Sequence, residues 1–234
     1  MCKKMILACF VLGSWGSGNV ARADVIATYN ADVGANIQNP TEQDWVETGL
    51  GNGVAVEGTV DNGTNAWRIV DDASGLNPRY GWFLTAEDFQ AMYDEGWTYV
   101  FVARCVSAGF CGWGVTTATD PGWGLTGRER VGFGITVTGA NALQISPIHG
   151  DTVVLGPGSA NDFHTIRCSG QAKSSEYEFF VDGVSYGLYD IKDGGRVQTP
   201  ITMMYSDLYP AAPAAPDERP SGISSAWVRE NWLY

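Results

Sequence analysis

Basic residues and histidine are scarce in this sequence, which holds 14 Lys and Arg, 26 Asp and Glu and 2 His. The formal net charge at pH 7 is −12. A surface of this charge repels phosphate backbones and anionic lipid, so nucleic acid and membrane surfaces are disfavoured as partners. A neutral glycan or a cation fits better. An anionic polysaccharide would need a local basic site that overcomes the repulsion from the negative net charge.

The sequence also lacks an apolar run of the about 20 residues that a membrane-spanning helix requires. Its N-terminus has Lys3 and Lys4, an apolar stretch over residues 5–12, and small and polar residues up to Ala23. This order predicts a secretory signal peptide over residues 1–23, removed on export. We therefore expect a secreted or periplasmic protein without membrane insertion. Its net charge would be 11 − 26 = −15, since Lys3, Lys4 and Arg22 leave with the peptide.

Cysteine is scarce as well, and the exported part keeps Cys105, Cys111 and Cys168. An oxidising exterior favours pairing. A Cys105–Cys111 disulfide would close a small loop at the end of an apolar strand, whereas Cys105–Cys168 would tie two strands together. We carry the first pair as the predicted disulfide, and the sequence leaves the second open. Neither histidine has finger-like spacing from these thiols, which disfavours a zinc site.

No linker or internal repeat divides residues 24–234, so we predict one domain and exclude a propeller or solenoid. The sequence holds 30 glycines and 9 tryptophans, and short apolar runs recur about every 8 to 12 residues. This pattern predicts an all-β protein, a two-sheet antiparallel sandwich. Strands are expected at 25–29, 54–60, 66–70, 97–104, 130–137, 142–146, 152–155, 163–168, 177–181, 185–189, 201–205 and 225–233.

Residues 97–104 are the most strand-like and should lie centrally in a sheet, since aromatic and β-branched residues fill them. One short surface helix is predicted over residues 85–95. The Thr85 hydroxyl can cap its first turn, and Gly96 ends it. Phe89 and Met92 lie three residues apart and should bury one face of this helix.

Two stretches near the C-terminal end carry a family resemblance. Asp162-Phe-His-Thr-Ile-Arg167 is followed by Glu176-Tyr-Glu-Phe-Phe-Val-Asp-Gly-Val184, where Asp182-Gly183 supplies a two-residue turn between alternating strands. Together with the closing stretch 226–232, this resembles the laminin-G and pentraxin-like group of concanavalin A-like jelly rolls. The resemblance covers the last third of the chain, and the rest agrees in the number of strands.

That resemblance implies a jelly roll that binds a glycan, cleaves a polysaccharide or mediates adhesion. The Glu-x-Asp-x-x-Glu strand of the glucanase branch is absent, because Glu176 and Glu178 are followed by Phe179 and Phe180. The Gln-Ile-His and Arg-Ser-Glu-Leu-Arg patterns of jelly-roll alginate lyases are missing too. His164, in the resembling strand, is predicted to be a packed structural residue.

Tryptophans flanked by glycine are the main candidates for ligand contact. Trp113 and Trp123 each stand between two glycines, where no neighbouring side chain covers the ring. An exposed ring can pack against the C–H face of a sugar. The alternative, of equal weight, is that both rings cover a core edge. Arg130 and Arg128 follow and could bind a carboxylate.

A second set of candidates concerns catalysis and metal binding. His149 lies in a turn and could act as a general acid or base, although a lone loop histidine is more often a bystander. Its partners would be Tyr205 or Tyr80 with Arg79 or Arg128. Oxygen-rich residues at Asp71 and Asp72 are weak Ca²⁺ candidates, and solvated turns are the preferred interpretation. No other cofactor is predicted.

Three hypotheses therefore stand. The first is a secreted carbohydrate-recognising jelly roll that binds a glycan through Trp113, Trp123 and Arg130, with help from Arg79 and Tyr80 in the region 71–82. The second is a polysaccharide lyase or glycoside hydrolase on the same fold. The third is a structural or adhesive surface module. The sequence does not decide whether the chain is an enzyme.

Overall fold

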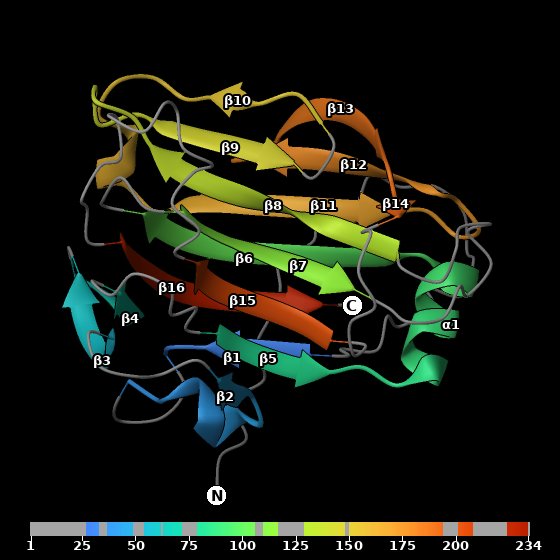
Figure 1. The fold of residues 1–234 in the computed structure, drawn as a ribbon, viewed down its shortest axis with the longest axis horizontal. Helices are drawn as coiled ribbons and strands as arrows, with labels where there is room; N and C mark the ends of the chain where they lie inside the picture. Colours follow the sequence, from blue (N-terminus) through green and yellow to red (C-terminus); the bar gives the residue numbers. More distant parts are fainter. Residues whose placement is uncertain are drawn as a thin grey trace, which may run out of the picture.

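The computed structural model is an all-β sandwich of two antiparallel sheets with one short α-helix, as predicted (Figure 1). It describes residues 27–32, 37–48, 54–61, 63–71, 79–105, 110–116, 129–147, 150–193, 201–207 and 224–233. Within these ranges, the backbone alone is described for residues 27–28, 48, 54–55, 70–71, 79, 81, 83, 110–116, 129–130, 192–193, 201–207 and 224–233.

Sheet A has the strand order β13-β12-β11-β6-β16-β4-β3, with β1 paired to β16. The bounds are β1 (Ala27–Asn30), β3 (Val54–Asp61), β4 (Thr64–Asp71), β6 (Trp97–Cys105), β11 (His164–Gly170), β12 (Glu176–Val181), β13 (Val184–Asp190) and β16 (Ser224–Leu233). The strand β6 lies between β11 and β16, which confirms the predicted central position of residues 97–104.

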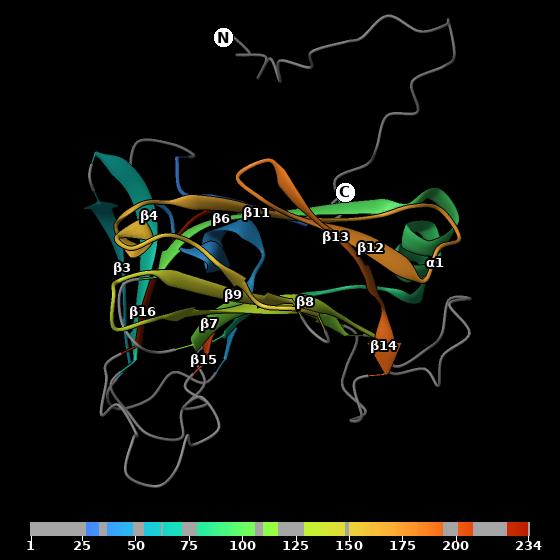
Figure 2. The same ribbon diagram turned by 90° about the horizontal axis from the view of Figure 1, so that it is seen from above.

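Sheet B has the order β10-β9-β8-β7-β15-β5-β2, with β14 paired to β8. The bounds are β2 (Val46–Thr48), β5 (Arg79–Phe83), β7 (Phe110–Thr116), β8 (Glu129–Val137), β9 (Leu143–Pro147), β10 (Val153–Val154), β14 (Lys192–Asp193) and β15 (Ile201–Asp207). Two 3₁₀ turns, η1 (Pro40–Gln43) and η2 (Ser159–Asn161), lie outside the sheets. Figure 2 shows the two sheets as facing layers.

Aromatic side chains fill the space between the layers. Along β6 every second residue is buried, beginning at Trp97, as expected for a strand with one face on a core. The ring of Phe133 from sheet B lies 5.8 Å from Phe101 and 5.9 Å from Phe179, both from sheet A, measured between ring centroids. These contacts join the two sheets through a single cluster.

The helix α1 (Ala86–Glu95) connects β5 of sheet B with β6 of sheet A at one end of the sandwich (Figure 1). Thr85 caps it as predicted: its hydroxyl accepts from the Asp88 amide at 3.1 Å, and the Asp88 carboxylate accepts from the Thr85 amide at 2.7 Å. Gly96, with φ at 86°, ends the helix. Phe89 and Met92 are buried, also as predicted.

The resembling hairpin, β12 and β13, turns as predicted at Asp182 and Gly183, which have φ values of 50° and 80°. His164 is 9% exposed and packs beside this turn. Its Nδ1 lies 2.6 Å from Asp182 Oδ2 and its Nε2 lies 2.8 Å from the Ser159 carbonyl oxygen. Both ring nitrogens therefore have a partner within the chain. His164 is therefore structural, as predicted.

One stretch differs from its prediction. Cys111-Gly-Trp-Gly114, expected on an exposed rim, belongs to β7, which pairs with β8 and β15 in the middle of sheet B. The sequence analysis also missed β2, β5 and β14. Glycine weakens the local signal for a strand, and pairing with distant segments supplies what β7 lacks locally.

Candidate functional site

The pairing of strands divides sheet B into rows of residues that lie opposite one another. One row joins Tyr80 of β5, Met204 of β15, Trp113 of β7 and Phe133 of β8. Tyr80 and Phe133 are both fully buried, so this row belongs to the core-facing side of the sheet. Because residues alternate between faces along a strand, the rows on either side of it belong to the outer side.

The first outer row joins two residues that the sequence analysis had assigned to a site. Arg79 of β5 lies opposite Tyr205 of β15, and Tyr205 lies opposite Gly112 of β7. Gly112 in turn lies opposite Gly134 of β8. The structure thus brings Arg79 and Tyr205, which are far apart in the chain, to directly paired positions.

The next outer row contains Gly114 and Gly132 on the same two strands as Gly112 and Gly134. Four positions on β7 and β8 therefore carry no side chain, and bare backbone lies beside Tyr205. Gly132 and Gly134 are buried, so other atoms of the chain lie over this floor. Glycine in a strand often marks close approach of a ligand or of another backbone.

A further outer row places Arg130 of β8 opposite Lys192 of β14. Among the strand positions that pair on this outer side, Arg79, Arg130 and Lys192 are basic and Asp207 is acidic. The formal charge of this set is 3 − 1 = +2, in a chain of net charge −12. These positions are here called the outer rows of sheet B, and for Arg79, Arg130 and Lys192 the structure describes the backbone alone.

Tyr80, predicted to contact a ligand, is instead a bridge inside the sandwich. Its hydroxyl accepts a hydrogen bond from Trp67 Nε1 at 3.0 Å and donates one to Glu47 Oε2 at 2.6 Å. Burial, and then the bond to Glu47, raise the pKa of Tyr80 well above its ordinary value. A fully buried and doubly bonded hydroxyl offers nothing to a ligand at a rim, so the prediction for Tyr80 was wrong.

The other predicted residues divide in two groups. Trp113 has its backbone in the core-facing row, opposite Phe133, and its side chain lies outside the described part of the structure. Trp123, Arg128, His149 and Asp72 lie outside the described residues altogether. Their proposed roles stay predictions. The sequence did hold one signal that was missed, the spacing of glycine by two at both Gly112-x-Gly114 and Gly132-x-Gly134.

The register between β11 and β6 tests the alternative disulfide between Cys105 and Cys168. Cys168 lies opposite Tyr99 and His164 opposite Ala103, so Cys105 lies six positions along β6 from the partner of Cys168. At about 3.4 Å per residue, this separation far exceeds the reach of a disulfide. A Cys105–Cys168 bridge is therefore excluded. Both thiols are buried, and burial raises the pKa of Cys168. The Cys111 side chain is not described, so the predicted Cys105–Cys111 pairing stays a prediction.

The described residues offer neither a cluster of metal ligands nor a membrane-spanning helix. These residues contain no group of three or more His, Cys, Asp or Glu side chains that could hold a metal ion. Asp71 belongs to β4, opposite Val54 and Ser224, and its carboxylate is not described, so calcium binding there stays untested. No helix in the described part has the length and apolar character to cross a membrane.

Known structures share this fold. A carbohydrate esterase from the Shiga toxin-encoding bacteriophage phi24B superposes with a TM-score of 0.63 at 14% identity, over 90% of this chain and 97% of the esterase chain. Botulinum neurotoxin type C, whose cell entry depends on two ganglioside molecules, gives a TM-score of 0.51 at 8% identity, over 90% of this chain and 47% of the toxin chain. The chain matches no family model and no curated protein sequence. At these identities the likeness concerns the fold alone.

Proposed function

We propose that this protein binds a carbohydrate across the outer rows of sheet B, and that an acidic polysaccharide is the preferred class. The observation that carries the proposal is the register of Arg79, Tyr205 and the four glycines beside them. Arginine binds sugar carboxylates through paired N–H donors, and tyrosine offers both a ring and a hydroxyl.

Two further observations support this choice. The outer rows carry a local excess of basic residues in an otherwise acidic chain, which favours an anionic over a neutral ligand. Of the two proteins that share the fold, one is a carbohydrate esterase and the other depends on two ganglioside molecules for cell entry. A binding role on a concanavalin A-like jelly roll is consistent with both observations.

The test is retention on immobilised alginate and polygalacturonate, with xylan and β-glucan as neutral counterparts. We expect retention of the purified protein on an acidic polymer. An Arg79→Ala variant should weaken binding about tenfold, since a charge-assisted hydrogen bond contributes about 1.5–3 kcal/mol. Arg68→Ala, on sheet A, is the matched control with the same loss of charge. Equal retention of the Arg79→Ala variant and the wild-type protein would contradict the proposal.

Cleavage of the same polymer is the second candidate, favoured by the direct pairing of Tyr205 with Arg79. In a β-elimination, a base removes the proton next to the uronate carboxylate, the glycosidic C–O bond breaks and a C=C bond forms. Arg79 would neutralise the carboxylate. Tyr205, as the tyrosinate, would take that proton and pass it to the departing glycosidic oxygen, which leaves as a hydroxyl. His149 and Arg128 remain further candidates for these roles.

Binding and cleavage are separated by following ultraviolet absorbance of unsaturated products, reducing ends and released acetate on the retained polymers. Tyr205→Phe should abolish products while retention persists, because the ring stays and the exchangeable proton is lost. Retention without any product from the wild-type protein would leave binding as the function and eliminate the enzyme. Products that survive Tyr205→Phe unchanged would assign the chemistry to other residues.

A further inference from the structure

A hollow lies over β11, β12 and β13 on the outer side of sheet A, across the sandwich from the outer rows of sheet B. It encloses about 330 Å³, within the usual range of small-molecule sites. Its lining includes Arg167, Ser169, Gln171, Glu178, Phe180 and Leu188. The residues between them on β11 and β12, such as Cys168 and Phe179, are buried. The hollow is therefore formed on the solvent side of the sheet and does not open into the core.

Strand register holds the polar lining in place. Arg167 lies opposite Phe180, and Ser169 lies opposite Glu178. The guanidinium carbon of Arg167 stands 3.7 Å from the centroid of the Phe180 ring, so the two groups are stacked. None of the described acidic residues forms an ion pair with Arg167. Stacking thus fixes the guanidinium and leaves the N–H donors at its edge for a ligand.

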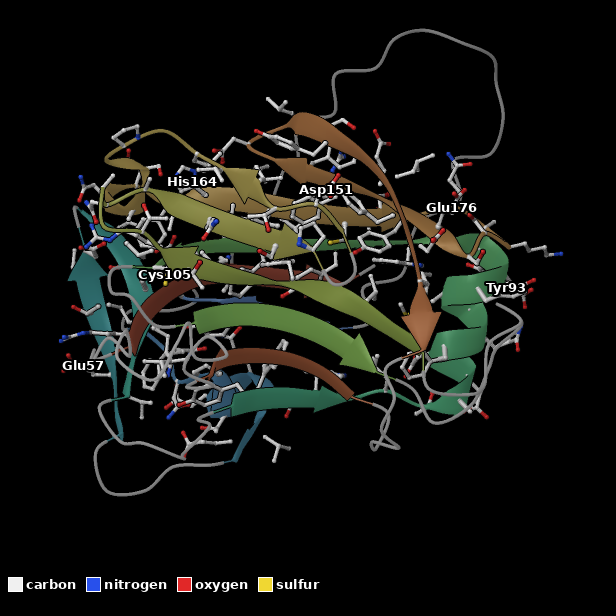
Figure 3. The ribbon with its side chains drawn as sticks, turned by 45° about the horizontal axis from the view of Figure 1, so that its top comes forward. Glu57, Tyr93, Cys105, Asp151, His164 and Glu176 are labelled. Atoms are coloured by element: carbon white, nitrogen blue, oxygen red, sulfur yellow. The ribbon has the colours of Figure 1, made fainter. Side chains whose placement is uncertain are left out.

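Acceptors lie next to these donors. Ser185 donates a hydrogen bond to Glu178 Oε1 at 2.5 Å, and Ser169 Oγ lies 2.9 Å from Thr98 Oγ1. Glu176 supplies a second carboxylate in the lining. Figure 3 shows Glu176 at the end of the molecule that carries α1, with His164 toward the opposite end. The hollow therefore combines donors, acceptors and the apolar surfaces of Phe180 and Leu188.

A neighbouring hollow extends the site toward α1. It encloses about 390 Å³, shares Ser169 and Gln171 with the first, and continues along Gly96 and Thr98. Two adjoining hollows with shared walls suit an elongated ligand of repeating units more than a single compact one.

We infer that this surface, here called the sheet A groove, is a second saccharide site that binds a neutral oligosaccharide. Each sugar hydroxyl is both donor and acceptor, which matches the mixture of Arg167 with Glu176 and Glu178. Two carboxylates against one guanidinium repel an anionic sugar. Phe180 and Leu188 provide the apolar contact that a sugar ring requires. The inference does not rest on the proposed function, because the groove and the outer rows of sheet B lie on opposite sides of the sandwich.

The experiment is calorimetric titration of the full chain with cellohexaose, xylohexaose and mannohexaose, with oligogalacturonate as the acidic probe. At least one neutral probe should bind. Arg167→Ala and Phe180→Ala should each weaken that binding about tenfold, and Arg167→Lys should not restore it, since lysine lacks the planar fork. Lys173→Gln, an equal change of charge in the adjacent turn, should have no effect. Thermal melting checks that each variant is folded.

Three results would overturn the inference: no neutral probe binds, neutral binding survives both Arg167→Ala and Phe180→Ala in folded protein, or Arg79→Ala alone removes it. The last result would place the neutral ligand on sheet B.

Oligogalacturonate distinguishes the two proposals. If the sheet A groove alone is correct, neutral binding is lost in Arg167→Ala and no acidic probe binds. If the proposed function alone is correct, acidic binding is lost in Arg79→Ala and no neutral probe binds.

Discussion

At the scale of residues, the partners of a polar side chain decide whether it serves the fold or is open to a ligand. Tyr80 was predicted to contact a ligand and His164 to be structural, and each is held by two hydrogen bonds within the sandwich. Arg167 had no role in the sequence analysis, yet it lines a groove and is stacked on Phe180. Residue type indicates which chemistry is available, and burial with hydrogen bonding decides whether a ligand can use it.

The bond between His164 and Asp182 gives a prediction at this scale. Asp182→Asn keeps a residue that tolerates positive φ at the turn but removes the carboxylate that lies 2.6 Å from His164 Nδ1. We expect a loss of about 1 kcal/mol in the free energy of unfolding, since the Asp182 side chain is half exposed. Urea denaturation measures it. Asp162→Asn, the same change at another exposed aspartate, should leave stability within error, and an equal loss in both variants would contradict the prediction.

At the scale of elements, local signals predicted most strands, the helix and the turn at Asp182 and Gly183. Buried residues alternate along β11 and β12 as predicted. Such features depend on neighbours in the sequence. By contrast, β7 is rich in glycine, and its place between β8 and β15 depends on pairing with distant segments. For the same reason the pairing of Arg79 with Tyr205 could not be predicted, although both residues had been named.

The cap of α1 provides the prediction for an element. Thr85→Ala removes the hydroxyl that accepts from the Asp88 amide, and the helix should lose about 1 kcal/mol of stability. Thr85→Ser retains the hydroxyl and should stay close to the wild type. The free energy of unfolding in urea distinguishes the two variants. If alanine and serine behave alike at position 85, the capping box does not stabilise the fold.

At the scale of the whole molecule, the core between the sheets is rich in aromatic rings, some with buried hydroxyls. Burial raises the pKa of Tyr29, Tyr80 and Tyr177 above the ordinary value of 10.0. These groups stay protonated in the folded protein at pH values where the unfolded chain begins to ionise. The stability they contribute is complete below pH 10 and is lost as the pH rises toward their folded-state pKa values.

We therefore expect the free energy of unfolding to fall steadily once the pH exceeds 10.0, the ordinary tyrosine pKa. Urea denaturation in buffers from neutral to strongly alkaline pH measures this slope, and tyrosine absorbance follows ionisation. Tyr177→Phe should flatten the slope, whereas Tyr186→Phe, at a residue 40% exposed, should not. If the slope is identical in the wild-type protein, Tyr177→Phe and Tyr186→Phe, buried tyrosines do not cause the loss of stability at alkaline pH.

The position of β16 has a consequence for how the protein is made. This strand comes last in the described chain, yet it lies inside sheet A, where it pairs with β6 on one side and with β4 and β1 on the other. Until residues 224–233 have left the ribosome, the nascent chain cannot join the two halves of that sheet. The edges of β6, β4 and β1 that pair with β16 stay unpaired until then. Sheet A therefore cannot be completed until residues 224–233 have been synthesised, and a premature stop before residue 224 leaves unpaired strand edges that are open to aggregation.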